Sequence, residues 1–285
     1  MVGPALIETV ERARGPYSLR LSARLATDAT RIFRGGRLTA VLPGGELGSA
    51  WQLPDGAVVM RAESEAGLDR LRFVLGLEDD HSAFLERFAD DPLVGRATRV
   101  LKGLRPIRLA TVAHALLRAL AGQLVTWKQA KEIERSVIRR TSPRHPSTLY
   151  EPPTNAALGR VGAAELRSFG LHARRAAALV RLCRSLDLER LRDLPTAAVA
   201  ERLERERGLG PWSVGVICLQ GLGRTERGLV GDLGLIKLCS QGQRRRVETA
   251  ETAALLEPYG EWAGMASVYL LAGLGRGLIP LRTAA

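Results

Sequence analysis

The chain has 285 residues, of which 46% are apolar and 25% charged, a balance typical of a globular protein. No apolar run reaches the about 18 residues that a membrane helix needs, and the first residues lack a basic region followed by an apolar core, so we expect neither a membrane span nor a signal peptide. The net charge is +12, and it is uneven: residues 1–99 carry 13 basic and 14 acidic side chains, and residues 100–285 carry 29 and 16. This asymmetry favours a polyanion partner such as nucleic acid, with a solvated arginine surface as the alternative.

Cysteine and histidine are too few and too scattered for a metal centre or a disulfide framework. The three cysteines form no Cys-x-x-Cys pair, and the four histidines lie far apart in sequence, so each histidine is expected at the surface or at a helix cap. The residues are Cys183, Cys218, Cys239, His81, His114, His145 and His172. We therefore expect no bound metal and a cytoplasmic protein with reduced thiols.

The first hundred residues show strand patterns followed by helical ones. Residues 17–25 alternate apolar and polar side chains, which predicts a half-buried strand. Residues 31–42 predict a hairpin that turns at Gly35-Gly36, and a second hairpin is expected to turn at residues 54–56. Helices are expected over 64–75 and 80–91. The region 1–99 is thus a small antiparallel sheet with helices, and it carries no visible catalytic group.

From about residue 100 the patterns are helical. Helices are predicted over 109–121, 126–139, 162–169, 172–186, 197–206, 211–222, 233–241, 248–257 and 261–273, with a proline-rich loop over 141–153. The fold class is therefore α+β. We divide the chain into an N-terminal sheet-and-helix domain (1–99), a helical domain (100–230) and C-terminal helices (231–285).

A glycine hairpin joins two of the predicted helices. Gly208-Leu209-Gly210 is followed by Pro211 in the first helical turn, where the missing N–H costs nothing. Glycines allow close approach of another backbone, and the free amides of the helix start suit a phosphate, while Leu209 is expected to pin the hairpin to the core. An ordinary glycine-capped turn between helices is the alternative for this spacing.

Several motifs together resemble the helix-hairpin-helix (HhH-GPD) DNA glycosylase superfamily, and most closely its DNA-3-methyladenine glycosylase II branch. They are Gly208-Leu-Gly-Pro-Trp-Ser213, Gly231-Asp-Leu-Gly-Leu-Ile-Lys237, Ala119-Leu-Ala-Gly-Gln-Leu-Val-Thr126, the segment 165–175 and Asp91-Pro92-Leu93. The resemblance covers residues 80–275, and the N-terminal sheet fits it by layout. It implies a base excision repair enzyme that flips a damaged base out of double-stranded DNA and hydrolyses its N-glycosidic bond.

The resemblance implies that Asp232 is the catalytic carboxylate. Cleavage develops an oxocarbenium-like cation on the sugar, and one carboxylate near C1′ stabilises this charge and orients water. Without the resemblance, a helix cap is the better interpretation of Asp232, and the two roles are compatible. Family members that also cut the strand use a lysine where this chain has Trp212, which implies a monofunctional enzyme. The four-cysteine iron–sulfur segment of some relatives is absent from the sequence.

Three aromatic residues are candidates for the base pocket. Trp212 is the first, because an electron-rich indole favours positively charged N-alkylated purines; a core tryptophan that covers the hairpin is the alternative. Trp262 and Tyr269 on the last predicted helix are weaker candidates, since core aromatics are common at their spacing. Around this pocket the chain departs from close relatives, with Val230-Gly231 before Asp232, Val216 on the second hairpin helix and Ala263-Gly264-Met265 after Trp262. These departures leave the choice of lesion open.

The remaining site residues are predicted to contact DNA. Leu124 matches the wedge that fills the gap left by the flipped nucleotide, with a core leucine at a helix end as the alternative. Gln123 is expected beside the flanking bases, and Gly208, Leu209 and Gly210 at the phosphates. The backbone carbonyls of residues 207–210 are a possible monovalent cation site by resemblance, and no other cofactor is expected.

The sequence thus predicts a monomeric, monofunctional glycosylase for alkylated purines such as 3-methyladenine and 7-methylguanine, acting on DNA in the cytoplasm, or at the nucleoid in a prokaryote. Two alternatives stay open: a glycosylase for an oxidised or deaminated base, and a non-catalytic helix-hairpin-helix DNA-binding protein. A basic protein unconnected with nucleic acid would require every motif match to be accidental.

Overall fold

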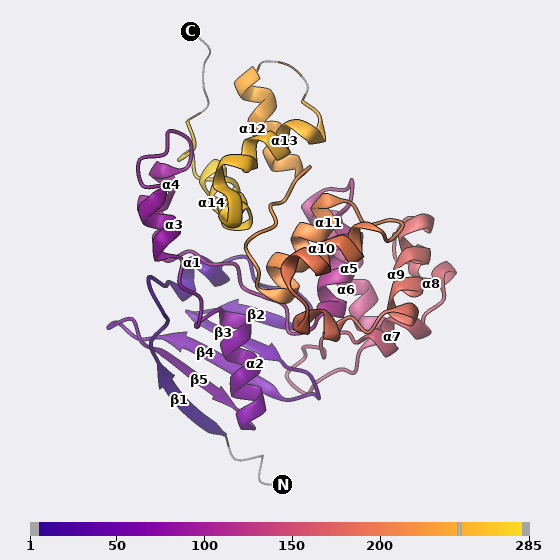
Figure 1. The fold of residues 1–285 in the computed structure, drawn as a ribbon. Helices are drawn as coiled ribbons and strands as arrows, with labels where there is room; N and C mark the ends of the chain where they lie inside the picture. Colours follow the sequence, from indigo (N-terminus) through magenta and orange to yellow (C-terminus); the bar gives the residue numbers. More distant parts are fainter. Residues whose placement is uncertain (1–5, 244, 246, 281–285) are drawn as a thin grey trace.

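The computed structural model describes residues 6–243, 245 and 247–280. Figure 1 shows a five-stranded sheet at one end of the molecule and helices over the rest. The α+β fold class predicted from the sequence is confirmed. None of the helices among the described residues has the length and apolar character needed to cross a membrane.

The sheet is antiparallel throughout, with the strand order β1-β5-β4-β3-β2. Its strands are β1 (Ile7–Glu11), β2 (Arg31–Arg34), β3 (Arg37–Val41), β4 (Leu47–Gln52) and β5 (Val58–Ala62). Both predicted hairpins are confirmed, with Gly35 and Gly36 at positive φ in the first turn. Leu38, Ala50 and Met60 lie opposite one another on adjacent strands and form the buried face of the sheet.

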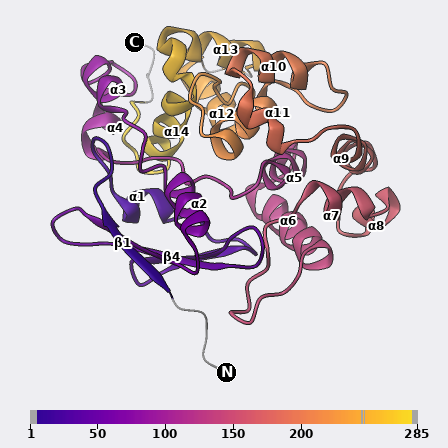
Figure 2. The same ribbon diagram turned by 60° about the horizontal axis from the view of Figure 1, so that its bottom comes forward.

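The predicted strand over 17–25 is wrong, because this segment contains the helix α1 (Leu19–Ala23). The same alternation also places Leu19 and Ala23 four residues apart, on one face of a helix, and both side chains are buried. Ser18 accepts a hydrogen bond from the Leu21 amide and so starts the helix. Figure 2 shows α1 and α2 (Glu65–Leu75) on the same side of the sheet.

The first edge strand, β1, was not predicted. It pairs with β5. Ile7 packs against the smaller core cluster and Glu8 is exposed, but at the end of the strand Val10 faces solvent and Glu11 is half-buried. Arg72 on α2 accounts for the inward carboxylate, because its guanidinium binds Glu11 at 2.6 Å. The inward face of this strand therefore combines the apolar Ile7 with the Glu11–Arg72 ion pair.

The helical part follows the predicted order closely. Its longer helices are α5 (Val112–Gly122), α6 (Trp127–Thr141), α9 (Ala173–Ser185), α10 (Thr196–Glu204), α12 (Leu233–Gln243), α13 (Thr249–Leu256) and α14 (Ala263–Leu274). Its short ones are α3 (Ser82–Arg87), α4 (Gly95–Val100), α7 (Asn155–Arg160), α8 (Ala163–Ser168) and α11 (Pro211–Val216), with 3₁₀ turns at Glu189–Asp193 and Glu257–Trp262. The sequence did not predict α4, α7 or either 3₁₀ turn, and α3 is shorter than the predicted 80–91 helix. The predicted 211–222 helix changes to a π-helix, η2 (Ile217–Leu222), in its second half.

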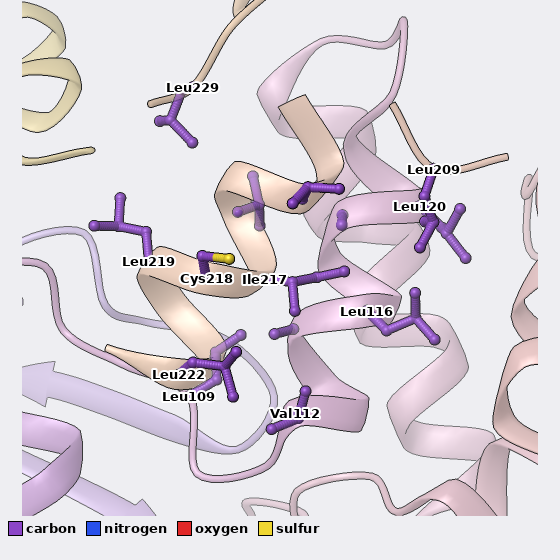
Figure 3. Packing of buried hydrophobic residues seen from close by; sticks show 14 of the residues in the cluster. Leu109, Val112, Leu116, Leu120, Leu209, Ile217, Cys218, Leu219, Leu222 and Leu229 are labelled. Atoms are coloured by element: carbon purple, nitrogen blue, oxygen red, sulfur yellow. The ribbon is translucent and has the colours of Figure 1, made fainter. Parts of the chain in front are cut away.

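Two hydrophobic clusters form the core. The smaller joins the sheet to α1 and α2, and the larger runs from α3 to α14. Figure 3 shows the centre of the larger cluster, where Val112 and Leu116 on α5 face Ile217 and Leu222 on η2. The helices α3 and α4 pack against α14, since the Phe84 and Tyr269 rings lie 5.2 Å apart. The helices α3 and α4 thus belong to the larger core cluster, and the division into domains stays a prediction.

A buried ionic cluster joins the N-terminal part to α5 and α6. Arg118 on α5 donates to Asp28 Oδ2 and Glu134 Oε1, each at 2.7 Å. Arg31 binds the same Asp28 carboxylate at 3.0 Å, and His114 Nε2 lies 2.6 Å from Glu134 Oε1. The expectation of a surface or capping position is therefore wrong for His114, which is fully buried.

The same cluster has the spacing of a metal site, because ligand atoms of Asp28, His114 and Glu134 lie within 4.8 Å of one another. Burial would raise the pKa of both carboxyls, but the adjacent guanidinium groups outweigh it and hold each pKa below its ordinary value. Arg31 and Arg118 already supply the compensating positive charge. We therefore assign the cluster a structural role.

His81 occupies the N-cap position of α3, one of the two expected positions for a histidine, but it is not at the surface. It is fully buried, and its Nε2 lies 3.2 Å from the Tyr269 hydroxyl. That hydroxyl also lies 3.2 Å from the Leu101 and Leu104 carbonyls, to which it can donate. Burial, and then the charge of Arg105, lower the pKa of His81 to about 4.

We predict that His81 makes the stability of the protein fall as the pH falls from 6.5 towards 4. The unfolded chain takes up a proton near pH 6.5, whereas the folded chain excludes it until about pH 4. Stability is thus fully present above the unfolded pKa and about 2 kcal/mol of it is lost by about pH 5. Urea unfolding of the wild type and of His81→Gln at both ends of this range tests it. The variant is expected to show the smaller loss, and equal losses would contradict the assignment.

Candidate functional site

Asp232 lies directly before α12, and both of its carboxylate oxygens accept hydrogen bonds. The Gly234 amide donates to Oδ1 at 2.8 Å, which makes Asp232 the cap of this helix. Trp212 Nε1 donates to Oδ2 at 3.0 Å. Gly231, at a φ of 86°, turns the chain into this position, and its amide donates to Thr252 Oγ1 at 2.7 Å. The carboxylate is half-buried and held in one orientation.

The Trp212 side chain contacts both Asp232 and the end of α5. It is the second residue of α11, and the benzo end of its half-buried indole rests on Gly122, the last residue of α5. A Cβ at position 122 would lie only 2.6 Å from Trp212 Cη2, so glycine is needed there. The indole therefore joins α5, α11 and the start of α12 in one site. Trp212 and Asp232 were predicted as site residues from the sequence, whereas their hydrogen bond and the role of Gly122 were not.

The loop between α5 and α6 carries the other predicted residues. Gln123 Nε2 donates to the Gly208 carbonyl and to Ser213 Oγ, both at 2.8 Å, so its amide group ties this loop to the glycine hairpin. A contact of Gln123 with flanking bases stays a prediction. Leu124 follows with 85% of its surface exposed and a φ of 55°, a conformation that leucine rarely adopts. The alternative of a core leucine is thus excluded.

The hairpin itself agrees with its predicted geometry. Gly208 has a φ of 96°, Leu209 is buried in the larger core cluster, and Gly210 directly precedes α11. A Cβ at position 208 would also press on Ala178 of α9 at 3.1 Å. The hairpin is therefore packed against the helical core, and its glycines lie beside the Gln123 and Leu124 loop.

Two carbonyls of the predicted cation site already accept hydrogen bonds. The Gly208 carbonyl accepts from Gln123, and the Arg207 carbonyl accepts from the cationic Arg181 guanidinium at 2.9 Å. Arg181 also binds Glu206 at 2.5 Å, which fixes its charge at this place. Each carbonyl keeps a second lone pair, and binding of a monovalent cation at residues 207–210 stays a prediction.

The two C-terminal pocket candidates lie apart from the Asp232 hydrogen bonds. Tyr269 is fully buried in the core, with its hydroxyl bound to His81 and to backbone carbonyls, so the prediction that it lines an open pocket is wrong. Tyr269 has aromatic neighbours, and its helix α14 is buried on nearly every side. This explains why the side chain lies in the core and not in a pocket. Trp262 is half-buried and packs 6.0 Å from the Phe84 ring, and its pocket role stays a prediction.

Known proteins similar to this chain were found by sequence and by structure. No family model matches the chain. The DNA-3-methyladenine glycosylase of Bacillus subtilis (strain 168) is 21% identical over 204 residues, which cover 68% of this chain and 67% of that protein. The structure of a 3-methyladenine DNA glycosylase from Archaeoglobus fulgidus superposes with a TM-score of 0.79 at 18% identity, over 94% of this chain and 98% of that one.

An 8-oxoguanine glycosylase/lyase of Clostridium acetobutylicum, in complex with double-stranded DNA, superposes almost equally well. Its TM-score is 0.77 at 16% identity, over 95% of this chain and 99% of that one. The fold is that of the helix-hairpin-helix DNA glycosylases. Glycosylases that act on two different lesions superpose on this chain with nearly equal TM-scores. The fold alone therefore does not identify the substrate.

We predict that Leu124→Gly does not destabilise the protein. The leucine buries little surface, and glycine adopts a positive φ without the cost of about 1 kcal/mol that a side chain pays there. The free energy of unfolding in urea is expected to stay equal or to rise by up to about 1 kcal/mol. A loss of the about 2 kcal/mol or more that is typical of a core leucine would contradict an exposed, strained role.

Proposed function

We propose that this protein is a monofunctional DNA glycosylase that hydrolyses the N-glycosidic bond of alkylated purines, such as 3-methyladenine and 7-methylguanine, and leaves an abasic site. The observation that carries the proposal is the Asp232 carboxylate, held by Trp212 beside the glycine hairpin and the exposed Leu124 loop. The fold of the similar proteins and their names support the reaction class. The substrate choice rests on the chemistry of the site.

In the proposed reaction the damaged nucleotide leaves the duplex and Leu124 enters the space that it vacates. The hairpin amides and the basic second part of the chain hold the phosphates. As the base departs, positive charge grows on the sugar, and the Asp232 carboxylate stabilises it while water adds at C1′. Trp212 acts as a positioning residue for Asp232, because its N–H fixes Oδ2.

Two features favour alkylated purines and a monofunctional reaction. Alkylation at a ring nitrogen gives the purine a positive charge, which the half-buried Trp212 indole and the Asp232 carboxylate both attract. The indole has no amine that could form an imine with the sugar, so water is left as the nucleophile. A substrate with an oxidised, uncharged base is the second candidate, favoured by the likeness to an 8-oxoguanine glycosylase/lyase.

We predict that Asp232→Asn loses most base excision, by about a hundredfold or more, but still binds abasic DNA. Both oxygens of Asp232 accept hydrogen bonds, and an amide offers only one acceptor, so the variant loses the charge and one of the two hydrogen bonds. Release of bases from methylated DNA and gel-shift binding to an abasic duplex measure the two effects.

Trp212→Phe is the graded comparison for this experiment. It keeps an aromatic side chain but removes the N–H and shortens the ring that reaches Gly122, so its excision rate should fall between the wild type and Asp232→Asn. Undiminished excision by Asp232→Asn would contradict the catalytic role of this carboxylate.

A panel of duplexes, each with one lesion, tests the substrate proposal. We expect release of 3-methyladenine or 7-methylguanine to exceed release of 8-oxoguanine or uracil by at least about tenfold, without added metal or nucleotide. Borohydride should trap no covalent protein–DNA adduct. Preferred release of an uncharged base would contradict the alkylpurine proposal, and a trapped adduct would contradict the monofunctional one. Salt-sensitive binding with no abasic product would instead identify a non-catalytic DNA-binding protein.

A further inference from the structure

Leu25, which follows α1, and Leu124 and Trp127, at the start of α6, are strongly exposed apolar side chains. Leu124, Leu25 and Trp127 have exposed fractions of 85%, 69% and 62%, the largest among the large hydrophobic residues that the structure describes. Lys131 Nζ lies 4.2 Å from the centre of the Trp127 ring and 3.5 Å from the Leu25 carbonyl. Leu124 precedes Trp127 by three residues, in the loop before α6. We call these two exposed side chains, together with Lys131, the patch.

Trp127 is held in place although it is exposed. It is the first residue of α6, where Thr126 and Gln129 form a reciprocal capping box. Lys131, one turn further on, contacts the ring and donates to the Thr27 carbonyl at 2.7 Å, which anchors its ammonium group. The backbone of Trp127 is thus held at the start of α6, while most of the surface of its indole is accessible. An ordered, exposed aromatic side chain is pre-organised for stacking, because little side-chain entropy is left to lose.

The charges around the patch suit a nucleic acid. Arg24 beside Leu25 and Lys128 beside Trp127 are both exposed, and Lys131 adds a third cation. The nearby acidic residue Glu132 lies 3.8 Å from Arg135, which offsets its charge. Apolar side chains among cations are typical of surfaces that insert between base pairs and hold the flanking phosphates.

We infer that Trp127 is a second DNA-inserting residue, which stacks on the unpaired base opposite the flipped nucleotide. The inference rests on the proposed function, since only base flipping creates that unpaired base. Leu124 is too small to fill the vacated space and also to cover the unpaired base on the opposite strand. An indole provides a flat surface on which that base can stack. Trp127 would then contribute to recognition of the opened duplex rather than to general DNA binding.

The test uses a duplex with a tetrahydrofuran abasic analogue opposite 2-aminopurine, and an intact duplex of the same length. Trp127→Ala is expected to bind the abasic duplex about tenfold more weakly, at the low end of what one base–aromatic stack contributes, and the intact duplex almost as well as the wild type. The 2-aminopurine fluorescence in the complex should be quenched with the wild type and brighter with Trp127→Ala. Trp127→Phe, which keeps a ring, should resemble the wild type.

Trp51→Ala is the matched control, because Trp51 is also flanked by cations, with Arg37 and Arg61 lying 4.2 and 5.0 Å from its ring, but belongs to the sheet. It should leave the binding of both duplexes unchanged.

Two results would overturn the inference alone while the wild type still excises bases: unchanged binding by Trp127→Ala, with or without loss of self-association in sedimentation, or an equal loss on both duplexes. A wild type that neither excises bases nor prefers the abasic duplex would overturn the proposed function, and this inference with it.

Discussion

The site depends on one side chain that three separate elements share. The Trp212 indole rests on Gly122 at the end of α5, belongs to α11, and donates its N–H to Asp232 before α12. Each contact restricts the next: without the space at Gly122 the ring could not lie where its nitrogen reaches the carboxylate. The half-buried Asp232 carboxylate accepts hydrogen bonds on both oxygens, so its orientation is fixed. Stabilisation of a positive charge at one sugar carbon requires such a fixed orientation.

The rest of the fold holds these elements in their relative positions. Gln123 ties the α5–α6 loop to the hairpin, and the packing of α5 against η2 fixes the helix that carries Gly122 (Figure 3). Further along α5, Arg118 joins Asp28 of the N-terminal part to Glu134 of α6. Because buried charges are costly unless each has its partner, this cluster specifies one way to dock the sheet against the helices. The sheet thereby supports the site without contributing a residue to it.

Much of this was accessible from the sequence, and the failures have identifiable physical causes. Glycines, a helix-start proline and periodic leucines act locally, so the hairpins and most helices were predicted correctly. The alternation over 17–25 fitted a strand and a short helix equally well, and only burial of Leu19 and Ala23 against α2 and the sheet decided between them. Tyr269 was misjudged, and the burial of His81 at its helix cap was not predicted, because their environment is built by segments almost 190 residues apart. The Trp212–Asp232 hydrogen bond is likewise a tertiary contact, which no sequence spacing reveals.

The central claim is that the Asp232 carboxylate stabilises positive charge at the sugar, and affinity for a charged abasic analogue measures it directly. A pyrrolidine analogue carries a protonated ring nitrogen, whereas tetrahydrofuran has the same shape without charge. The account predicts that the wild type binds the pyrrolidine duplex at least about tenfold more tightly than the tetrahydrofuran duplex, and that Asp232→Asn binds the two alike. An equal preference in the wild type and the variant would contradict it.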